Sequence, residues 1–113
     1  RITFNVTGQI TRITLFKISD EENQKRILSL YQQMPQKALK GGKPYIVSVK
    51  AGLAVADQRA QGFTLAAVST FASKEDMDYY DESCAAHQEL KVIAKDTHQG
   101  FAMVFFQDQV ERQ

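Results

Sequence analysis

The sequence predicts an α+β domain of the split βαβ kind, in which helices cover one face of a four-stranded antiparallel sheet. Two observations lead to this fold. Strand-like and helix-like apolar spacings follow one another in the order strand, helix, strand, strand, helix pair, strand. The first and last strands are apolar on both faces, although the helices cover only one face.

The first strand is predicted over residues 10–18. Its apolar side chains fall on both faces, with Ile13 and Leu15 on one and Ile10, Phe16 and Ile18 on the other. A strand with this pattern needs cover on both of its sides.

A helix follows, and the run Ser19-Asp20-Glu21-Glu22 supplies its cap and a negative first turn. Pro35 lacks an amide donor, so we expect the helix to kink or restart there and Gly41-Gly42 to end it. Its apolar stripe has helical spacing and consists of Ile27, Leu30, Tyr31, Met34 and Ala38.

Two strands occupy the middle of the chain. The second strand is predicted from Tyr45 to Ala51, after Pro44, with Tyr45, Val47, Val49 and Ala51 on one face. A connection bounded by glycines, residues 52–62, leads to the third strand at residues 63–71.

The most informative stretch, residues 73–106, contains two helices and the last strand. Ser73 caps a helix that begins at Lys74 and carries Tyr79 and Tyr80 near its end. Ser83 is predicted to cap the second helix in the same way. If the helices are nearly continuous, Tyr80 and His87, seven residues apart, share one side. The pattern therefore makes a phenol and an imidazole neighbours at an apolar surface.

The last strand, residues 101–106, has no polar position. The helices cover one face of the sheet, so a monomer exposes an apolar patch larger than single proteins usually tolerate. A second copy of the same sheet is the natural cover. The sequence thus predicts a two-fold homodimer with two sheets face to face.

Composition excludes several classes of partner. The 113 residues fit one domain, assigned to residues 9–113 after an extension at residues 1–8. The formal charge is +1 with both signs interspersed, which gives no footprint for nucleic acid. No run is long and apolar enough for a membrane span. A single cysteine, Cys84, excludes an internal disulfide and is typical of an intracellular protein, so a cytoplasmic location is expected.

Three stretches resemble the stress-responsive α/β barrel domain family: ITRITLFKIS, QGFTLAAVSTFASKEDMDYYDESCAAH and HQGFAMVFF. The resemblance covers about residues 9–110 and implies a ferredoxin-like fold that forms a dimeric α+β barrel. Members of this family include a plant polyketide cyclase. That enzyme closes an aromatic ring by intramolecular aldol condensation, with a histidine as base and a tyrosine nearby.

Carried onto this chain, the resemblance implies that the base is His87, in Ala-Ala-His, and that the tyrosine is Tyr80, or Tyr79 if the joint is offset by one. Arg12 and Leu65 stand where the cyclase has two further histidines. The implied ligand-binding residues in a cavity between helices and sheet are Tyr31, Tyr79, Arg12 and Leu65.

Three functions are compatible with these residues. The first is binding of a small apolar, aromatic or polyketide-like ligand, with cyclase or lyase activity that uses His87 as general base. The second is a non-catalytic, stress-related dimer or partner-binding protein, in which His87 bonds a phenol or backbone carbonyl at the helix joint. The third is a cofactor-free oxygenase. No cofactor or metal is expected, since His87 and His98 lack a carboxylate at a supporting spacing.

Overall fold

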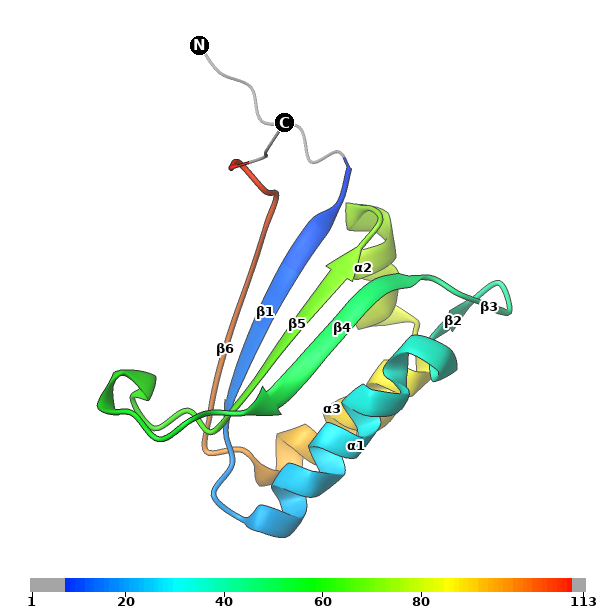
Figure 1. Cartoon of the computed structure of the whole chain (residues 1–113). Coiled ribbons are helices and arrows are strands. Elements are labelled where there is room, and N and C mark those ends of the chain that lie inside the picture. Colours follow the sequence, from blue (N-terminus) through cyan, green and yellow to red (C-terminus); the bar gives the residue numbers. More distant parts are fainter. Residues whose placement is uncertain (1–7, 111–113) are drawn as a thin grey trace.

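The sheet contains four antiparallel strands whose spatial order differs from their order in the chain. The computed structural model describes residues 8–110. Within them β1 lies in the middle of the sheet, paired with β5 on one side and β6 on the other, and β4 extends the sheet beyond β5 (Figure 1). The predicted fold class, a ferredoxin-like α+β sandwich, is confirmed. The strands are β1 (Ile10–Lys17), β4 (Ile46–Leu53), β5 (Leu65–Phe71) and β6 (Gly100–Phe106).

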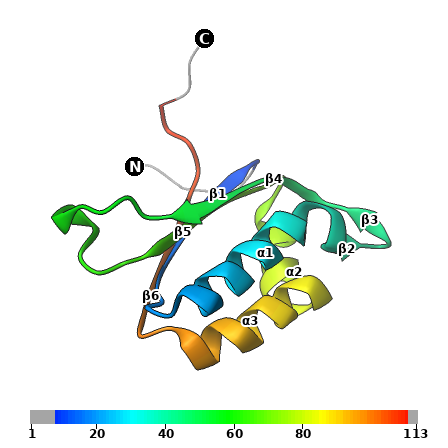
Figure 2. The ribbon, with the colours of Figure 1, turned by 60° about the horizontal axis from the view of Figure 1, so that its bottom comes forward.

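All three helices lie on one face of this sheet, as Figures 1 and 2 show. They are α1 (Glu21–Lys37), α2 (Lys74–Glu82) and α3 (Ala85–Thr97). Of the predicted N-terminal extension, residues 1–7 lie outside the described residues, so the boundary of the domain stays a prediction. In the described part of the chain, no helix combines the length and the apolar character that crossing a bilayer requires.

The core forms where the helices meet the alternate residues of the strands. In β1, Ile10 and Phe16 are buried, whereas Ile13 and Leu15, which point the other way, are partly exposed. The predicted division of this strand into two faces is therefore correct. The largest fully buried side chains include Phe71, Ile10, Ile18, Ile27, Met34, Leu65 and Leu90.

The helix starts agree with the sequence in two cases out of three. Asp20 accepts a hydrogen bond from the amide of Asn23 at 3.0 Å, and Ser73 accepts one from the amide of Asp76 at 3.1 Å. The predicted cap at Ser83 is wrong. Ser83 ends α2 by donating its amide to the Tyr79 carbonyl, and Cys84 caps α3 without a side-chain hydrogen bond.

The end of α1 also differs from the prediction. The helix continues only two residues past Pro35, to Lys37, and Gly41-Gly42 lie beyond it. These glycines form the turn of a small hairpin between β2 (Leu39–Lys40) and β3 (Lys43–Pro44). Their φ angles of 60° and 79° are those of a primed hairpin turn, which accommodates two successive glycines well.

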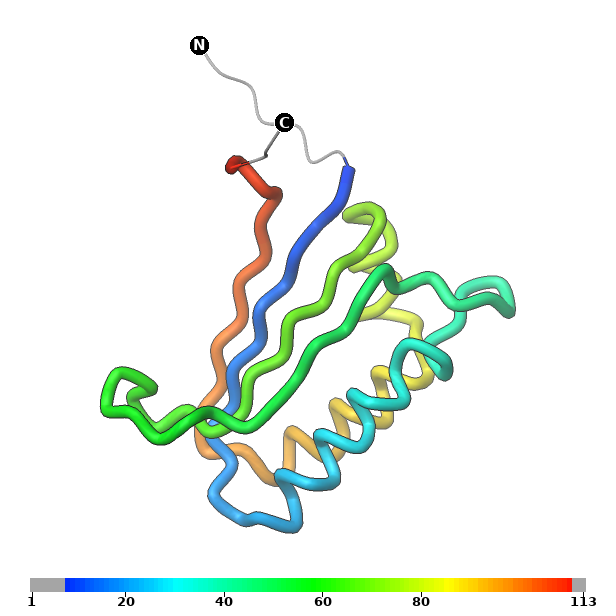
Figure 3. The backbone as a smooth tube through the Cα atoms, in the orientation of Figure 1, coloured from blue at the N-terminus to red at the C-terminus, as the bar shows by residue number. Residues whose placement is uncertain are grey.

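β4 begins one residue later than predicted and is irregular. Its pairing with β5 shifts between Ile46 and Ser48, so Val47 is half exposed while Val49 packs against the core. The prediction that Val47 and Val49 share a face is therefore wrong, because a bulge reverses the alternation. The connection from β4 to β5 carries a 3₁₀ turn, η1 (Gln58–Ala60), and projects beyond the sheet (Figure 3).

The face of the sheet turned away from the helices, called here the open face, is apolar. Strand pairing places Val104 opposite Ile13 and Phe106 opposite Thr11, and 60% of Val104 and 45% of Phe106 are exposed. The apolar members of the open face are Ile13, Leu15, Ala66, Val68, Ala102, Val104 and Phe106.

Candidate functional site

A cavity of about 190 Å³ lies between α3 and the strands β1 and β6, with one contribution from α1. Helical spacing brings a row of α3 residues onto one side of it, and alternate residues of β1 form the opposite side. The lining residues are Arg12, Thr14, Phe16, Tyr31, His87, Leu90, Lys91, Ala94, Lys95, His98 and Phe101.

The two ends of the cavity differ in character. At one end the rings of Phe16, His98 and Phe101 cluster, with centroid distances between 5.4 and 6.1 Å. At the other end lie Arg12 and His87, the first from β1 and the second from the first turn of α3. A ligand in this cavity therefore meets an aromatic end and a polar end.

His87 is held in one orientation. Its side chain is buried, with 3% of the residue exposed, and its ring stacks on that of Tyr80 at a centroid distance of 3.6 Å and an angle of 11°. The nitrogen Nδ1 lies 2.8 Å from the backbone carbonyl of Tyr80. Because a carbonyl only accepts, Nδ1 carries the proton in neutral His87 and the lone pair is on Nε2.

His87 lines the cavity, and its second ring nitrogen, Nε2, carries no proton in this tautomer. Among residues 8–110, Nε2 has no hydrogen-bond partner, and it is not one of the fully buried atoms. Burial lowers the pKa of His87 from 6.5 to about 4, against the opposing effect of the Tyr80 carbonyl. His87 is therefore neutral at pH 7, with an acceptor nitrogen available to a ligand.

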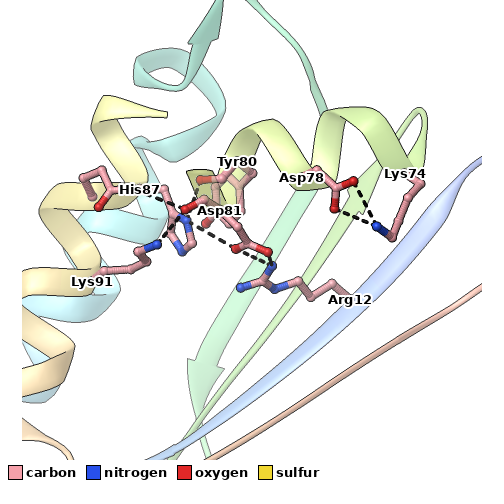
Figure 4. A network of polar contacts seen from close by, with 8 residues as sticks. Arg12, Lys74, Asp78, Tyr80, Asp81, His87 and Lys91 are labelled. Atoms are coloured by element: carbon pink, nitrogen blue, oxygen red, sulfur yellow. Dashed lines mark hydrogen bonds and ion pairs between the residues drawn. The ribbon is translucent and has the colours of Figure 1, made fainter. Parts of the chain in front are cut away.

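An ion pair lies beside the imidazole. One guanidinium nitrogen of Arg12, Nη1, lies 2.7 and 2.8 Å from the two carboxylate oxygens of Asp81 (Figure 4). Asp81 Oδ1 is also 3.8 Å from Nδ1 of His87, and Lys91 donates to the backbone carbonyl of Asp81 at 2.7 Å. The last residues of α2 are thus tied to β1 and to α3, which fixes the joint between the two helices.

Two tyrosines, Tyr31 and Tyr80, lie near this polar end and have different roles. Tyr31 lines the cavity, and burial raises the pKa of its hydroxyl to about 12, so the group is a neutral donor. No residue in the described part of the chain bonds that hydroxyl. Tyr80 is buried as well, and burial raises its pKa, but it supports the His87 ring from behind and is not a lining residue.

Two other residues predicted to bind ligand lie elsewhere. Tyr79 donates its hydroxyl to the Leu39 carbonyl at 3.0 Å and meets Tyr45 edge to face, because adjacent helix residues point about 100° apart. Leu65 is fully buried in β5, on the opposite side of β1 from β6. The structure thus brings together His87, Tyr80, Tyr31 and Arg12, and it places Tyr79 and Leu65 outside this group.

The sequence profile of the stress-responsive A/B barrel domain matches residues 10–107 of the chain. The protein belongs to this family.

Two similar proteins show different things about this chain. A curated relative, the fusaristatin A biosynthesis cluster protein of Gibberella zeae, is 39% identical over 106 residues, or 93% of this chain and 77% of that protein. Hydroxynitrile lyase from Passiflora edulis has the same fold, with a TM-score of 0.76 and 18% identity over 93% of this chain and 98% of that one. At this identity the second likeness concerns the fold alone.

A further structural neighbour bears on assembly. A protein of unknown function from Jannaschia sp. CCS1, described as dimeric and ferredoxin-like, aligns with a TM-score of 0.71 and 15% identity over 89% of this chain and all of that one. Solved structures that share this fold therefore include a protein described as dimeric.

Several residues of this A/B barrel domain's cavity were not singled out from the sequence. Lys91 and Lys95 lie four and eight residues after His87, at a spacing that repeats along one helix face, so the signal was present. Asp81 carries no such signal, because its role depends on Arg12, which is 69 residues away. In residues 8–110 no group of three or more His, Cys, Asp or Glu side chains is placed to hold a metal ion.

Proposed function

We propose that this protein binds a small aromatic or polyketide-like molecule in the cavity beside His87 and acts on it as a cyclase or lyase. The observation that carries the proposal is Nε2 of His87, an unprotonated acceptor on a buried ring whose orientation is fixed from two sides. The relation to a biosynthesis cluster protein and the likeness in fold to a hydroxynitrile lyase agree with it.

In the cyclase reaction, the hydroxyl of Tyr31 donates to a ligand carbonyl while Nε2 of His87 takes a proton from the adjacent carbon. The electron pair left on that carbon forms a bond to a second carbonyl carbon of the same molecule, and the new alkoxide takes the proton back from His87. The lyase reaction runs in the opposite sense. His87 takes a hydroxyl proton, the carbon–carbon bond breaks as the carbonyl forms, and the leaving carbanion receives the proton.

The surroundings of His87 suit this exchange of a proton. While His87 is protonated, its Nδ1–H remains bonded to the Tyr80 carbonyl, and the Asp81 carboxylate lies 3.8 Å away. Both features stabilise the imidazolium, whereas burial and Arg12 oppose it. The charged form is therefore short-lived, which favours return of the proton to the product.

The volume of the cavity limits the ligand. An apolar cavity of about 150 Å³ holds one benzene molecule. The 190 Å³ beside His87 therefore suits a single ring with one or two substituents. A longer polyketide chain extends from the open side of the cavity.

We further propose that the protein is a homodimer in which two open faces pack together, and that it acts in the cytoplasm. The apolar open face and the dimeric neighbour support the assembly. The single buried cysteine agrees with a reducing compartment.

The catalytic proposal is tested by hydrogen–deuterium exchange at the methyl group of acetophenone, followed by NMR in deuterated buffer. The wild-type protein should accelerate the exchange, and His87→Gln should reduce the acceleration by about a hundredfold or more. Lys43→Gln, a change at an exposed lysine of the hairpin, is the control and should match wild type. The absence of any acceleration by the wild-type protein would overturn the proposal.

A non-catalytic function is the second candidate, because the stacking and hydrogen bond of His87 also tie α3 to α2. In that case, His87→Gln lowers the melting temperature of the dimer by several degrees, and the wild-type protein exchanges acetophenone no faster than buffer does.

A further inference from the structure

The charged side chains that line the cavity are all positive. They are Arg12, Lys91 and Lys95, and no aspartate or glutamate is among the lining residues. The protein as a whole is almost neutral, with a formal charge of +1, so this local excess does not reflect its composition. An uncompensated excess of one sign at a cavity raises the local concentration of ligands of the opposite sign.

The three cations differ in how far their charge is compensated. Arg12 is paired with Asp81 at 2.7 Å and is therefore largely neutralised. Lys91 donates to the carbonyl of Asp81, which is a neutral acceptor, and so keeps its charge. Lys95 has no ion pair or hydrogen bond within residues 8–110. The positive charges of Lys91 and Lys95 are thus available to a ligand at the rim of the cavity.

The other acidic groups of α3 do not cancel these charges. Glu89 pairs with Lys37 of α1 at 3.6 Å and is directed toward that helix. Asp96 follows Lys95, which places it about 100° further round the helix, and it does not line the cavity. No acidic side chain of α3 therefore occupies the row formed by His87, Lys91 and Lys95.

We propose that the cavity selects ligands that carry an anionic group, a carboxylate above all, and that Lys91 and Lys95 hold this group at the rim. The inference rests on the proposed function, since it requires a ligand beside His87. Lys91 is one helical turn from His87, so its ammonium and the imidazole meet neighbouring parts of one small molecule. Leu90, Ala94 and Thr14 then contact the apolar ring of that molecule.

The expected selectivity is moderate, because both lysines are exposed and water screens their charges. An exposed ion pair changes an equilibrium constant by up to about fivefold. With both lysines contributing, a carboxylate should bind about five- to tenfold more tightly than a neutral molecule of the same shape.

The test compares benzoate with benzamide, a neutral molecule of nearly the same shape, at pH 7.5. Binding is followed by the NMR signals of the His87 ring and the Leu90 amide. Wild type should prefer benzoate about five- to tenfold, and the preference should fall when sodium chloride is raised to about 0.5 M. In the double variant Lys91→Gln/Lys95→Gln the two affinities should agree within about twofold, while Lys43→Gln, the control, retains the preference.

The outcomes separate this inference from the proposed function. If benzamide and benzoate shift the His87 and Leu90 signals with equal affinity, the cavity binds ligands but the selectivity proposed here is wrong. If Lys43→Gln reduces the preference as much as the double variant does, the effect belongs to the net charge and the assignment to Lys91 and Lys95 fails. If neither molecule reaches the cavity, both proposals fall.

Discussion

The two faces of the sheet come from the same strands, yet they are completed in different ways. On the covered face, Phe16 and Leu65 are buried under helices of the same chain, and the buried Arg12 forms its ion pair with Asp81 there too. On the open face, Val104 and Phe106 are as apolar and remain about half exposed. The comparison shows that helices of the same chain cover the apolar side chains of one face, whereas those of the open face stay about half exposed, as the proposed dimer would explain.

The largest expected effect tests the open face. Val104→Asp should weaken the proposed dimer about a thousandfold, because a charge would be buried in the interface without a partner, once from each copy. Val92→Asp is the matched control, since 63% of Val92 and 60% of Val104 are exposed, but Val92 lies on the outer side of α3. Sedimentation velocity across a dilution series measures both. Equal dissociation of the two variants would contradict the assignment of the open face as the interface.

The next effect tests the covered face through pH. His87 has a pKa of about 4 when folded and an ordinary value of 6.5. As the pH falls, the unfolded chain takes up the proton first, so the free energy of unfolding decreases from pH 6.5 down to about pH 4 and is unaffected above 6.5. Integrated over this window, the loss is about 3 kcal/mol.

His87→Gln removes this contribution and keeps an amide donor for the Tyr80 carbonyl. Urea unfolding of wild type and variant at pH 7.5 and pH 4, at one protein concentration, gives the difference between the two pH dependences. Because both proteins contain the same carboxylates, the contribution of these groups to the pH dependence of stability cancels in that difference. Parallel stability curves for wild type and variant would show that His87 titrates normally and does not lie buried as described.

A smaller effect is expected at the ion pair. Arg12→Met should lower the free energy of unfolding by about 2 kcal/mol, because it leaves the Asp81 carboxylate, 34% exposed, without its cation. Adding Asp81→Asn should restore part of the loss, and a double-mutant cycle gives the coupling.

Arg59→Met is the control for this change. Arg59 bonds Asp57 at 2.9 Å, but its side chain is 87% exposed, so this change should leave the free energy of unfolding nearly unchanged. Similar losses for Arg12→Met and Arg59→Met would mean that the pair of Arg12 with Asp81 contributes no more to the free energy of unfolding than an exposed pair does.

Much of the fold was predictable because it depends on local patterns. The alternation in β1 separates Ile13 from Phe16, and the spacing of Tyr80 and His87 places two rings side by side. The bulge at Val47 and the hairpin at Gly41-Gly42 were not predicted. A bulge arises from the pairing between two strands, and a pair of glycines fits a helix end as well as a hairpin turn.

The candidate site was predictable only in part, for a related reason. His87 and Tyr80 are close in the chain, whereas the pairing of Arg12 with Asp81 joins β1 to α2 and appears only in three dimensions. Tyr79 was assigned to the cavity although it lies next to Tyr80, since the exact angle at a helix joint decides which of two adjacent residues faces inward. The joint also differs from the prediction at Ser83, which ends α2, while α3 begins after Cys84.

The smallest effect concerns that joint and the helices that cover the sheet. Ser73 accepts the Asp76 amide at the start of α2, so Ser73→Ala should lower the free energy of unfolding by about 1 kcal/mol. Ser83→Ala should change it by less than about 0.3 kcal/mol, because Ser83 makes its contact through the backbone and α3 begins at Cys84. Chemical denaturation of both variants measures the difference. A loss at Ser83 equal to that at Ser73 would mean that its hydroxyl caps α3 after all, and that the position of His87 depends on a contact different from the one described.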